Sequence, residues 1–130
     1  MKLIKIINSR AAVERLTQKR FNSFSLARKL AALRKRVDEE TEFFNAEQNK
    51  ALKEHAEFEN DRLVTEGGGI KMKSHDDLTA YESEMQTLMD TEIDSIEPVT
   101  ISEADFRSPE DYPTPEDMLA LDGLVEFAEA

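Results

Sequence analysis

The feature that most constrains the fold is a long run, from Leu26 to Leu63, that contains neither glycine nor proline. Ala, Leu, Glu, Lys, Arg and Gln dominate this run, and all have high helix propensity. A single helix over the run would be about 57 Å long at 1.5 Å per residue. That length exceeds the width of a globule of 130 residues, whose radius of gyration is roughly 14 Å. We therefore predict a long helix over about residues 25–63 that protrudes, breaks between residues 43 and 49, or packs in an oligomer.

The apolar residues in the first half of this run follow a coiled-coil spacing. Leu26, Leu30, Leu33 and Val37 are separated by four, three and four residues, which is typical of a helical hairpin or a coiled-coil seam. If this spacing is extended through the rest of the run, one of the two seam positions is occupied by Glu40, Glu47 and Glu54. Because unpaired carboxylates are costly in an apolar seam, the second half is either solvated or meets basic side chains of a partner.

The segments around the run predict a second long helix and a small sheet. A glycine-containing connection over residues 64–75 leads to an amphipathic stripe that predicts an antiparallel helix over about residues 76–92. Short strands are expected near residues 2–7, 70–73 and 98–102, and the last could pair with the first. A further helix is expected to start at Ser9. The fold class is thus α+β, predominantly α, in a single domain over residues 1–130, with a sheet of two to three strands.

The C-terminal segment predicts an irregular acidic loop followed by a short helix. Residues 102–113 are acidic and contain two prolines. Thr114-Pro115-Glu116-Asp117 is a favourable helix start, and Gly123 would close that helix. Residues 124–130 form a tail, expected to be flexible, whose apolar side chains either dock on the core or anchor another chain. Those side chains are Leu124, Val125 and Phe127.

The charges are distributed very unevenly along the chain. The net charge is -11, yet residues 1–37 hold eleven Lys and Arg against one acid, Glu14. The densest basic cluster consists of Arg28, Lys29, Arg34, Lys35 and Arg36. One interpretation is that this basic start pairs with the acidic remainder of the chain. The other is that it leaves a basic face free for phosphate or for an acidic partner.

The sequence predicts no catalytic, cofactor or metal site. The absence of cysteine excludes disulfides, zinc–thiolate sites, iron–sulfur clusters and thiol catalysis. His55 and His75 are the only histidines, and neither has a glutamate three residues before it, as di-iron carboxylate helices require. Residues 90–101 resemble a calcium-binding loop but lack its central glycine and its final glutamate. We therefore expect both histidines to have ordinary packing or surface roles.

The order of motifs resembles a family of small tailed-phage proteins without an assigned activity. The resemblance is carried by ARKLAALRKRVDEETEFFNAEQNKALKEH, by YESEMQTLMDTEI after the glycines, and by the ending TPEDMLALDGLVEF. It implies a phage or prophage gene with a small accessory role, and it implies no catalytic residues.

Three functions follow as hypotheses. The first is a non-enzymatic phage accessory protein that acts by helix-mediated protein–protein interaction, in assembly or on the virion, as an oligomer. The second is an acidic inhibitor of a host nucleic-acid-processing or defence enzyme. The third is a nucleic-acid-binding accessory protein that uses the basic N-terminal face. The partner is expected to be the protein itself, a phage structural protein or a host protein. With no membrane segment or leader in the sequence, the expected location is the host cytoplasm or the virion.

Overall fold

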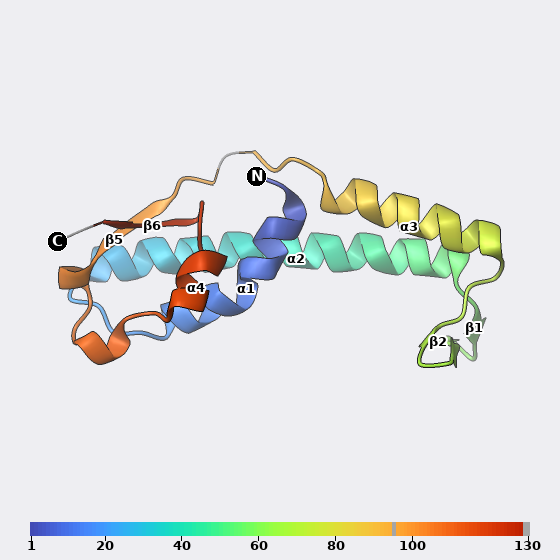
Figure 1. Cartoon of the computed structure of the whole chain (residues 1–130), viewed down its shortest axis with the longest axis horizontal. Helices are drawn as coiled ribbons and strands as arrows, with labels where there is room; N and C mark the ends of the chain where they lie inside the picture. Colours follow the sequence, from blue (N-terminus) through green and yellow to red (C-terminus); the bar gives the residue numbers. More distant parts are fainter. Residues whose placement is uncertain (95, 129–130) are drawn as a thin grey trace. The chain divides into compact units, whose positions relative to one another are not determined.

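The computed structural model describes residues 1–94 and 96–128. Its fold is α+β and predominantly α, as predicted, with four α-helices and three two-stranded sheets among these residues (Figure 1). The chain forms two compact units, one from residues 1–41 and 92–130 and the other from residues 42–91. The single domain expected over residues 1–130 stays a prediction. No described helix combines the length and the apolar character that a bilayer crossing needs.

The first unit begins with helix α1, Leu3–Thr17, so the strand predicted near residues 2–7 is wrong. Its N-terminal residues Leu3 and Ile6 are fully buried and continue the helical spacing of Val13 and Leu16. Burial of one continuous helical face therefore outweighs the preference of isoleucine for strands. The expected helix start at Ser9 is also wrong, because Ser9 lies inside α1. Its hydroxyl group donates a hydrogen bond to the Ile6 carbonyl.

Helix α2 spans Phe24–His55 and contributes residues 24–41 to the first unit. Its predicted seam residues, Leu26, Leu30, Leu33 and Val37, are all buried in the core of this unit. The helix is continuous through residues 43–49, where a break was one of the expectations. It ends at His55, eight residues before the predicted end near Leu63.

A parallel pair of strands completes the first unit. Strand β5, Val99–Ser102, matches the prediction near residues 98–102, but it pairs with β6, Val125–Ala128, rather than with the N-terminus. The crossover between these strands holds two 3₁₀ helices, Glu103–Asp105 and Pro109–Asp111, within the predicted acidic loop. Helix α4, Pro115–Ala120, follows with the predicted Thr114 cap, because the Thr114 hydroxyl accepts a hydrogen bond from the Asp117 amide.

The predicted flexible tail is wrong for the residues that the structure describes. Leu124 and Val125 are buried in the first unit, and Phe127 packs against the same core. Gly123 makes this path possible with a φ of +85° at the end of α4. The tail therefore follows the docked alternative as far as Ala128, and Glu129 and Ala130 lie outside the described residues.

The second unit contains residues 42–55 of α2, two small hairpins and helix α3, His75–Met89. Residues predicted to extend the long helix instead form strands β1, Phe58–Glu59, and β2, Arg62–Leu63. The turn between them places Asn60 and Asp61 at φ of 51° and 62°, a pair of positive values that type I′ hairpins require. Helix propensity alone did not reveal this turn, because Asn-Asp is a weaker turn signal than Asn-Gly.

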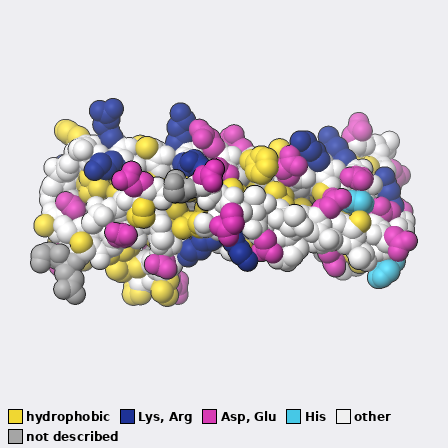
Figure 2. All heavy atoms as spheres, turned by 90° about the horizontal axis from the view of Figure 1, so that it is seen from above, with side chains coloured by type: hydrophobic (Ala, Val, Ile, Leu, Met, Phe, Trp, Pro, Cys, Tyr) yellow, Lys and Arg dark blue, Asp and Glu magenta, His cyan; other side chains and the backbone are white. Residues whose placement is uncertain are grey.

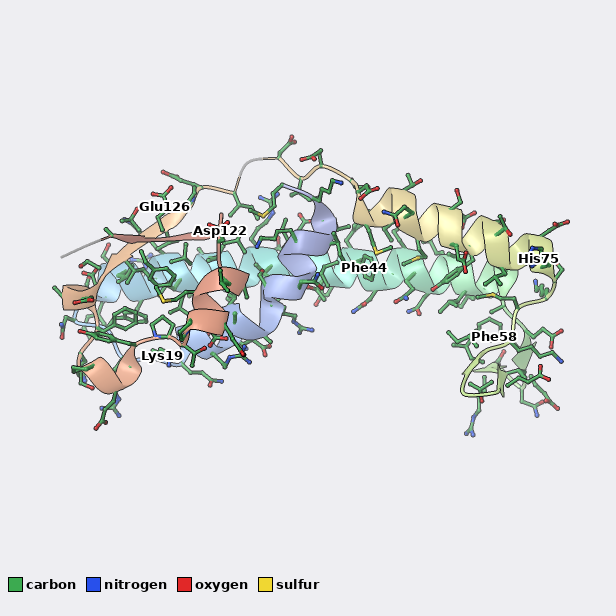
Figure 3. The ribbon with its side chains drawn as sticks, in the orientation of Figure 1. Lys19, Phe44, Phe58, His75, Asp122 and Glu126 are labelled. Carbon is green, nitrogen blue, oxygen red and sulfur yellow. The ribbon has the colours of Figure 1, made fainter. Side chains whose placement is uncertain are left out.

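The second hairpin uses the glycines that were expected to form a connection. Strands β3, Thr65–Glu66, and β4, Gly69–Ile70, flank Gly67 and Gly68, both at positive φ. The strand expected near residues 70–73 is thus only partly present, since it ends at Ile70 and Met72 makes a single bridge with Ala56. The hairpin side chains, including that of Phe58, are shown in Figure 3.

Helix α3 packs antiparallel to α2, as predicted for residues 76–92, although it ends at Met89. Gln48 of α2 donates a hydrogen bond to the Tyr81 hydroxyl, whereas His55, further along α2, contacts Asp77, nearer the start of α3. This reversed order defines the antiparallel direction. The predicted Ser74 cap is also present, because the Ser74 hydroxyl accepts a hydrogen bond from the Asp77 amide.

A candidate binding face on helix α2

The first half of α2 presents a cationic face opposite its buried stripe. Phe24, Arg28, Ala31 and Lys35 follow one another at intervals of four, three and four residues, so they share one side of the helix. All four are exposed, and the Phe24 side chain is 87% exposed. Lys29 is exposed beside them. We call these five residues the cationic face; they lie in the first unit, where Figure 2 shows Lys and Arg side chains standing out from the surface.

The predicted basic cluster divides into paired and unpaired residues. Arg34 donates a hydrogen bond to the Thr17 hydroxyl and lies 3.7 Å from Glu14 and 3.9 Å from Asp38. Arg36 binds Glu40 one turn later, with 3.1 Å between Nε and Oε1. In contrast, Arg28, Lys29 and Lys35 form no ion pair with any residue that the structure describes. Internal pairing therefore accounts for Arg34 and Arg36, and the free-face interpretation fits the other three.

The cationic character extends to a small hollow beside Phe24. Lys19, Arg20 and Arg107 line this hollow of about 210 Å³ together with Phe21. The Arg107 amide donates a hydrogen bond to the Arg20 carbonyl, which draws the two chain segments together. Lys19 lies just beyond the Gln18 cap at the end of α1 (Figure 3). Arg107, from a distant and acidic segment, is thus the third cation at this hollow, beside Lys19 and Arg20 of the basic N-terminal region.

Sequence reasoning missed Phe24 and this hollow. Arg107 stands among acids and prolines, and nothing in its local sequence indicates that it lies beside Arg20. Its position depends on the bridge between Phe21 and Phe106, whose rings are 5.1 Å apart. The sequence does place Phe21 and Phe24 within four residues after Arg20, and such a pattern of aromatic rings beside cations could have indicated a binding surface.

The acidic seam residues, for which solvation and contact with a basic partner were the two expectations, include two that pair within α2. Glu40 is paired with Arg36, and Glu47 accepts a hydrogen bond from Lys50 at 2.9 Å. Glu54 is exposed and lies near His55. The apolar residues proposed as an anchor, Leu124 and Val125, are 0% and 3% exposed, so they are unavailable to a partner in this conformation.

Comparison of the chain with family models, with curated proteins and with solved structures gives no match.

Proposed function

We propose that this protein is a small non-enzymatic accessory protein that binds an acidic protein partner through the cationic face of α2. The observation that carries the proposal is the exposed Phe24 ring on the same side of the helix as Arg28 and Lys35, which lack acidic partners among the described residues. The resemblance to tailed-phage proteins supports a phage-encoded role, in assembly or in contact with a host protein.

The composition of the face suits a protein interface. Burying a phenylalanine side chain stabilises a complex by about 1.5–3 kcal/mol, and aromatic residues and arginine are enriched at interface centres. The side chains between the cations, at Ala27, Ala31 and Ala32, are exposed and small, so the backbone of a partner helix can approach closely. A partner helix with acidic side chains would neutralise Arg28 and Lys35 and would cover Phe24.

A protein partner is favoured over a nucleic acid by the overall charge. The chain carries a net charge of -11, which repels a polyanion at long range. A partner with a local acidic patch needs to neutralise only the cations that it touches. The association rate should then fall with added salt, since charge complementarity mainly accelerates encounter.

The experiment begins with capture of partners from phage-infected cells and ends with purified components. The tagged full chain is compared with Arg28→Gln/Lys35→Gln and Phe24→Ala. Lys53→Gln serves as the control, because Lys53 is an exposed cation on the same helix that has no ion pair among the described residues. We expect a purified acidic partner to bind the wild type and Lys53→Gln alike, and the other variants at least about tenfold more weakly.

Two results would overturn the proposal. One is equal binding of the purified partner by the wild type and the Arg28→Gln/Lys35→Gln variant. The other is tighter binding of duplex DNA than of any captured protein at the same salt concentration, which would favour the nucleic-acid hypothesis. Light scattering of the wild type and of the double variant would reveal whether the acidic partner is a second copy of this chain.

A further inference from the structure

The second unit contains a cluster of one histidine and three carboxylates that the sequence analysis did not identify. His55, the last residue of α2, is only 6% exposed. Its Nδ1 lies 2.9 Å from Oδ1 of Asp77, and its Nε2 lies 3.1 Å from Oε1 of Glu84. Oε2 of Glu54 is 3.9 Å from the same Nε2. Both ring nitrogens are therefore held in defined positions by side chains from α2 and α3.

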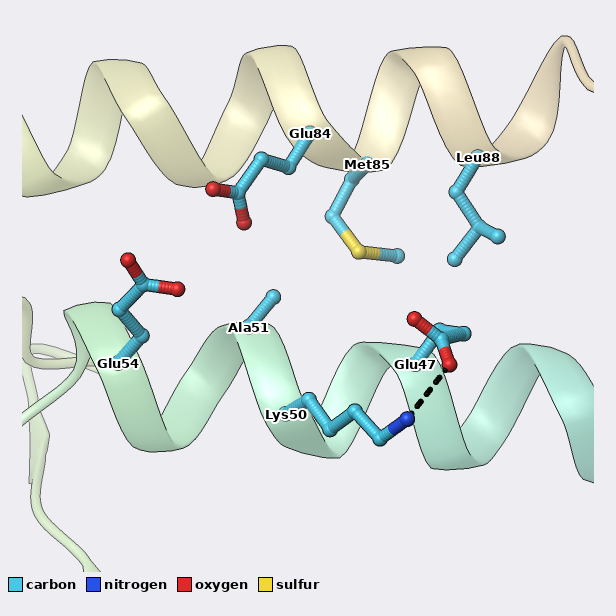
Figure 4. A pocket seen from close by; sticks show the side chains of 7 residues that line it. All are labelled: Glu47, Lys50, Ala51, Glu54, Glu84, Met85 and Leu88. Atoms are coloured by element: carbon cyan, nitrogen blue, oxygen red, sulfur yellow. Dashed lines mark hydrogen bonds and ion pairs between the residues drawn. The ribbon is translucent and has the colours of Figure 1, made fainter.

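The carboxylates of Glu54 and Glu84 approach one another although they carry the same charge. Figure 4 shows them directed toward each other across a pocket of about 260 Å³ between the two helices. Their nearest oxygens and a His55 ring nitrogen all lie within 4.8 Å of one another. Like charges at this separation repel, and a cation held between them would relieve this repulsion.

The nearby lysines do not pair with the carboxylates of Glu54 and Glu84 among the described residues. Lys50, which also lines the pocket, pairs with Glu47 in the structure. The Lys73 ammonium group donates to the Glu54 backbone carbonyl at 3.0 Å rather than to either carboxylate. A proton on His55 supplies one positive charge for the three carboxylates around it.

We propose that Nε2 of His55, Glu54 and Glu84 bind one divalent transition-metal ion of the zinc class, which clamps α2 to α3. The inference goes beyond the sequence-based expectation of no metal site and is independent of the cationic face. Asp77 takes the supporting role, since it accepts the Nδ1 proton of His55 and so directs Nε2 toward the ion. Histidine ligands in metal sites are commonly oriented by a carboxylate in this way.

The donor set favours zinc over magnesium or calcium. Imidazole nitrogen suits zinc and its neighbours, whereas magnesium and calcium prefer oxygen ligands alone. Zinc bonds of about 2.0–2.2 Å place tetrahedral donor atoms roughly 3.3 Å apart. The separation of 3.1 Å between His55 and Glu84 already fits, and Glu54 must shorten its separation of 3.9 Å by a side-chain rotation. Glu54 is exposed and free to do so, and a water molecule from the pocket would complete the coordination.

The test is calorimetric titration of the metal-free full chain with ZnCl₂. We expect one saturable site and a gain in thermal stability on loading. Glu54→Gln and Glu84→Gln should each weaken binding at least about tenfold, and Asp77→Asn by about 10–100-fold. Among the described residues, the Glu54 carboxylate makes only the long contact with His55, so circular dichroism should show Glu54→Gln to be folded like the wild type.

The control variant is His75→Gln, because His75 is exposed at the start of α3, as Figure 3 shows, and has no role in the proposed site. Loss of zinc binding in His75→Gln would overturn the proposal, as would the absence of one-to-one binding in the wild type. Unchanged affinity in folded Glu54→Gln and Glu84→Gln would do the same. Magnesium or calcium binding as tight as zinc would contradict the assigned class of ion.

Discussion

Arg15 of α1 forms a bidentate ion pair with Asp117 of α4 through two nitrogens of its guanidinium group. Nε donates to Oδ2 at 2.9 Å and Nη2 donates to Oδ1 at 2.6 Å. The Asp117 residue is 7% exposed, so its carboxylate depends on this partner for charge compensation. The pair joins residues 102 positions apart in sequence and fixes α4, whose end leads into strand β6. It also gives Arg15 an acidic partner within the chain, in contrast to Arg28, Lys29 and Lys35.

Replacing Asp117 with Asn should therefore destabilise the first unit. Asparagine keeps the shape of the side chain but lacks the charge that binds both guanidinium nitrogens, and hydrogen bonds to charged groups contribute about 1.5–3 kcal/mol. Urea unfolding should show a loss of that order. Asp122→Asn is the matched control, since Asp122 is exposed and its side chain has no partner among the described residues. Equal stability of the two variants would refute this role for the pair.

The same pair predicts how stability depends on pH. Hydrogen bonds from Arg15 hold the pKa of Asp117 below its ordinary value, even though burial acts in the opposite direction. A carboxyl group whose pKa is lowered by folding stabilises the native state above its unfolded pKa, near about 4, and this contribution is lost as pH falls through the folded pKa. The stability difference between the wild type and Asp117→Asn should thus be largest near neutral pH and shrink in acid. A difference that grows as pH falls would contradict this sign.

The hairpin formed by β3 and β4 predicts a contrast between two neighbouring glycines. Gly68 has a φ of +82°, and an added Cβ would meet no atom within 4 Å, so Gly68→Ala costs backbone strain alone, about 1–2 kcal/mol. Gly69 has no positive φ, and its Cβ would make only an ordinary contact at 3.9 Å with the Glu66 carbonyl. Hydrogen exchange should therefore be faster at the hairpin amides in Gly68→Ala than in Gly69→Ala. Similar protection in both variants would show that the turn does not need its glycine.

Local sequence patterns predicted the elements whose physical cause is itself local. The stripe from Leu26 to Val37 is buried, and Ser74 and Thr114 cap their helices. Each depends on residues within a few turns of one another. The long helix was overextended for the same reason, because the residues after His55 have helix-forming side chains, whereas their conformation is set by the Asn60-Asp61 turn.

Features that depend on contacts between residues far apart in the chain could not be predicted from local sequence patterns. Whether Arg34 is free depends on Glu14 and Asp38, and the clustering of Lys19 and Arg20 with Arg107 depends on the bridge between Phe21 and Phe106. The residues of the cationic face were partly predicted, as Arg28, Lys29 and Lys35. Phe24 was missed, because its sequence neighbourhood does not indicate that a phenylalanine ring is left exposed at the start of α2.

The most direct test of the central claim is a charge swap across the interface. Once a purified partner is available, binding is measured for Arg28→Glu/Lys35→Glu with the native partner and with a partner whose acidic contact residues are changed to lysine. We predict that reversal on this chain alone weakens binding by at least about tenfold and that reversal on both sides restores much of the affinity. Unaltered binding of the reversed chain, or a loss that the reversed partner does not rescue, would contradict the assignment of this face.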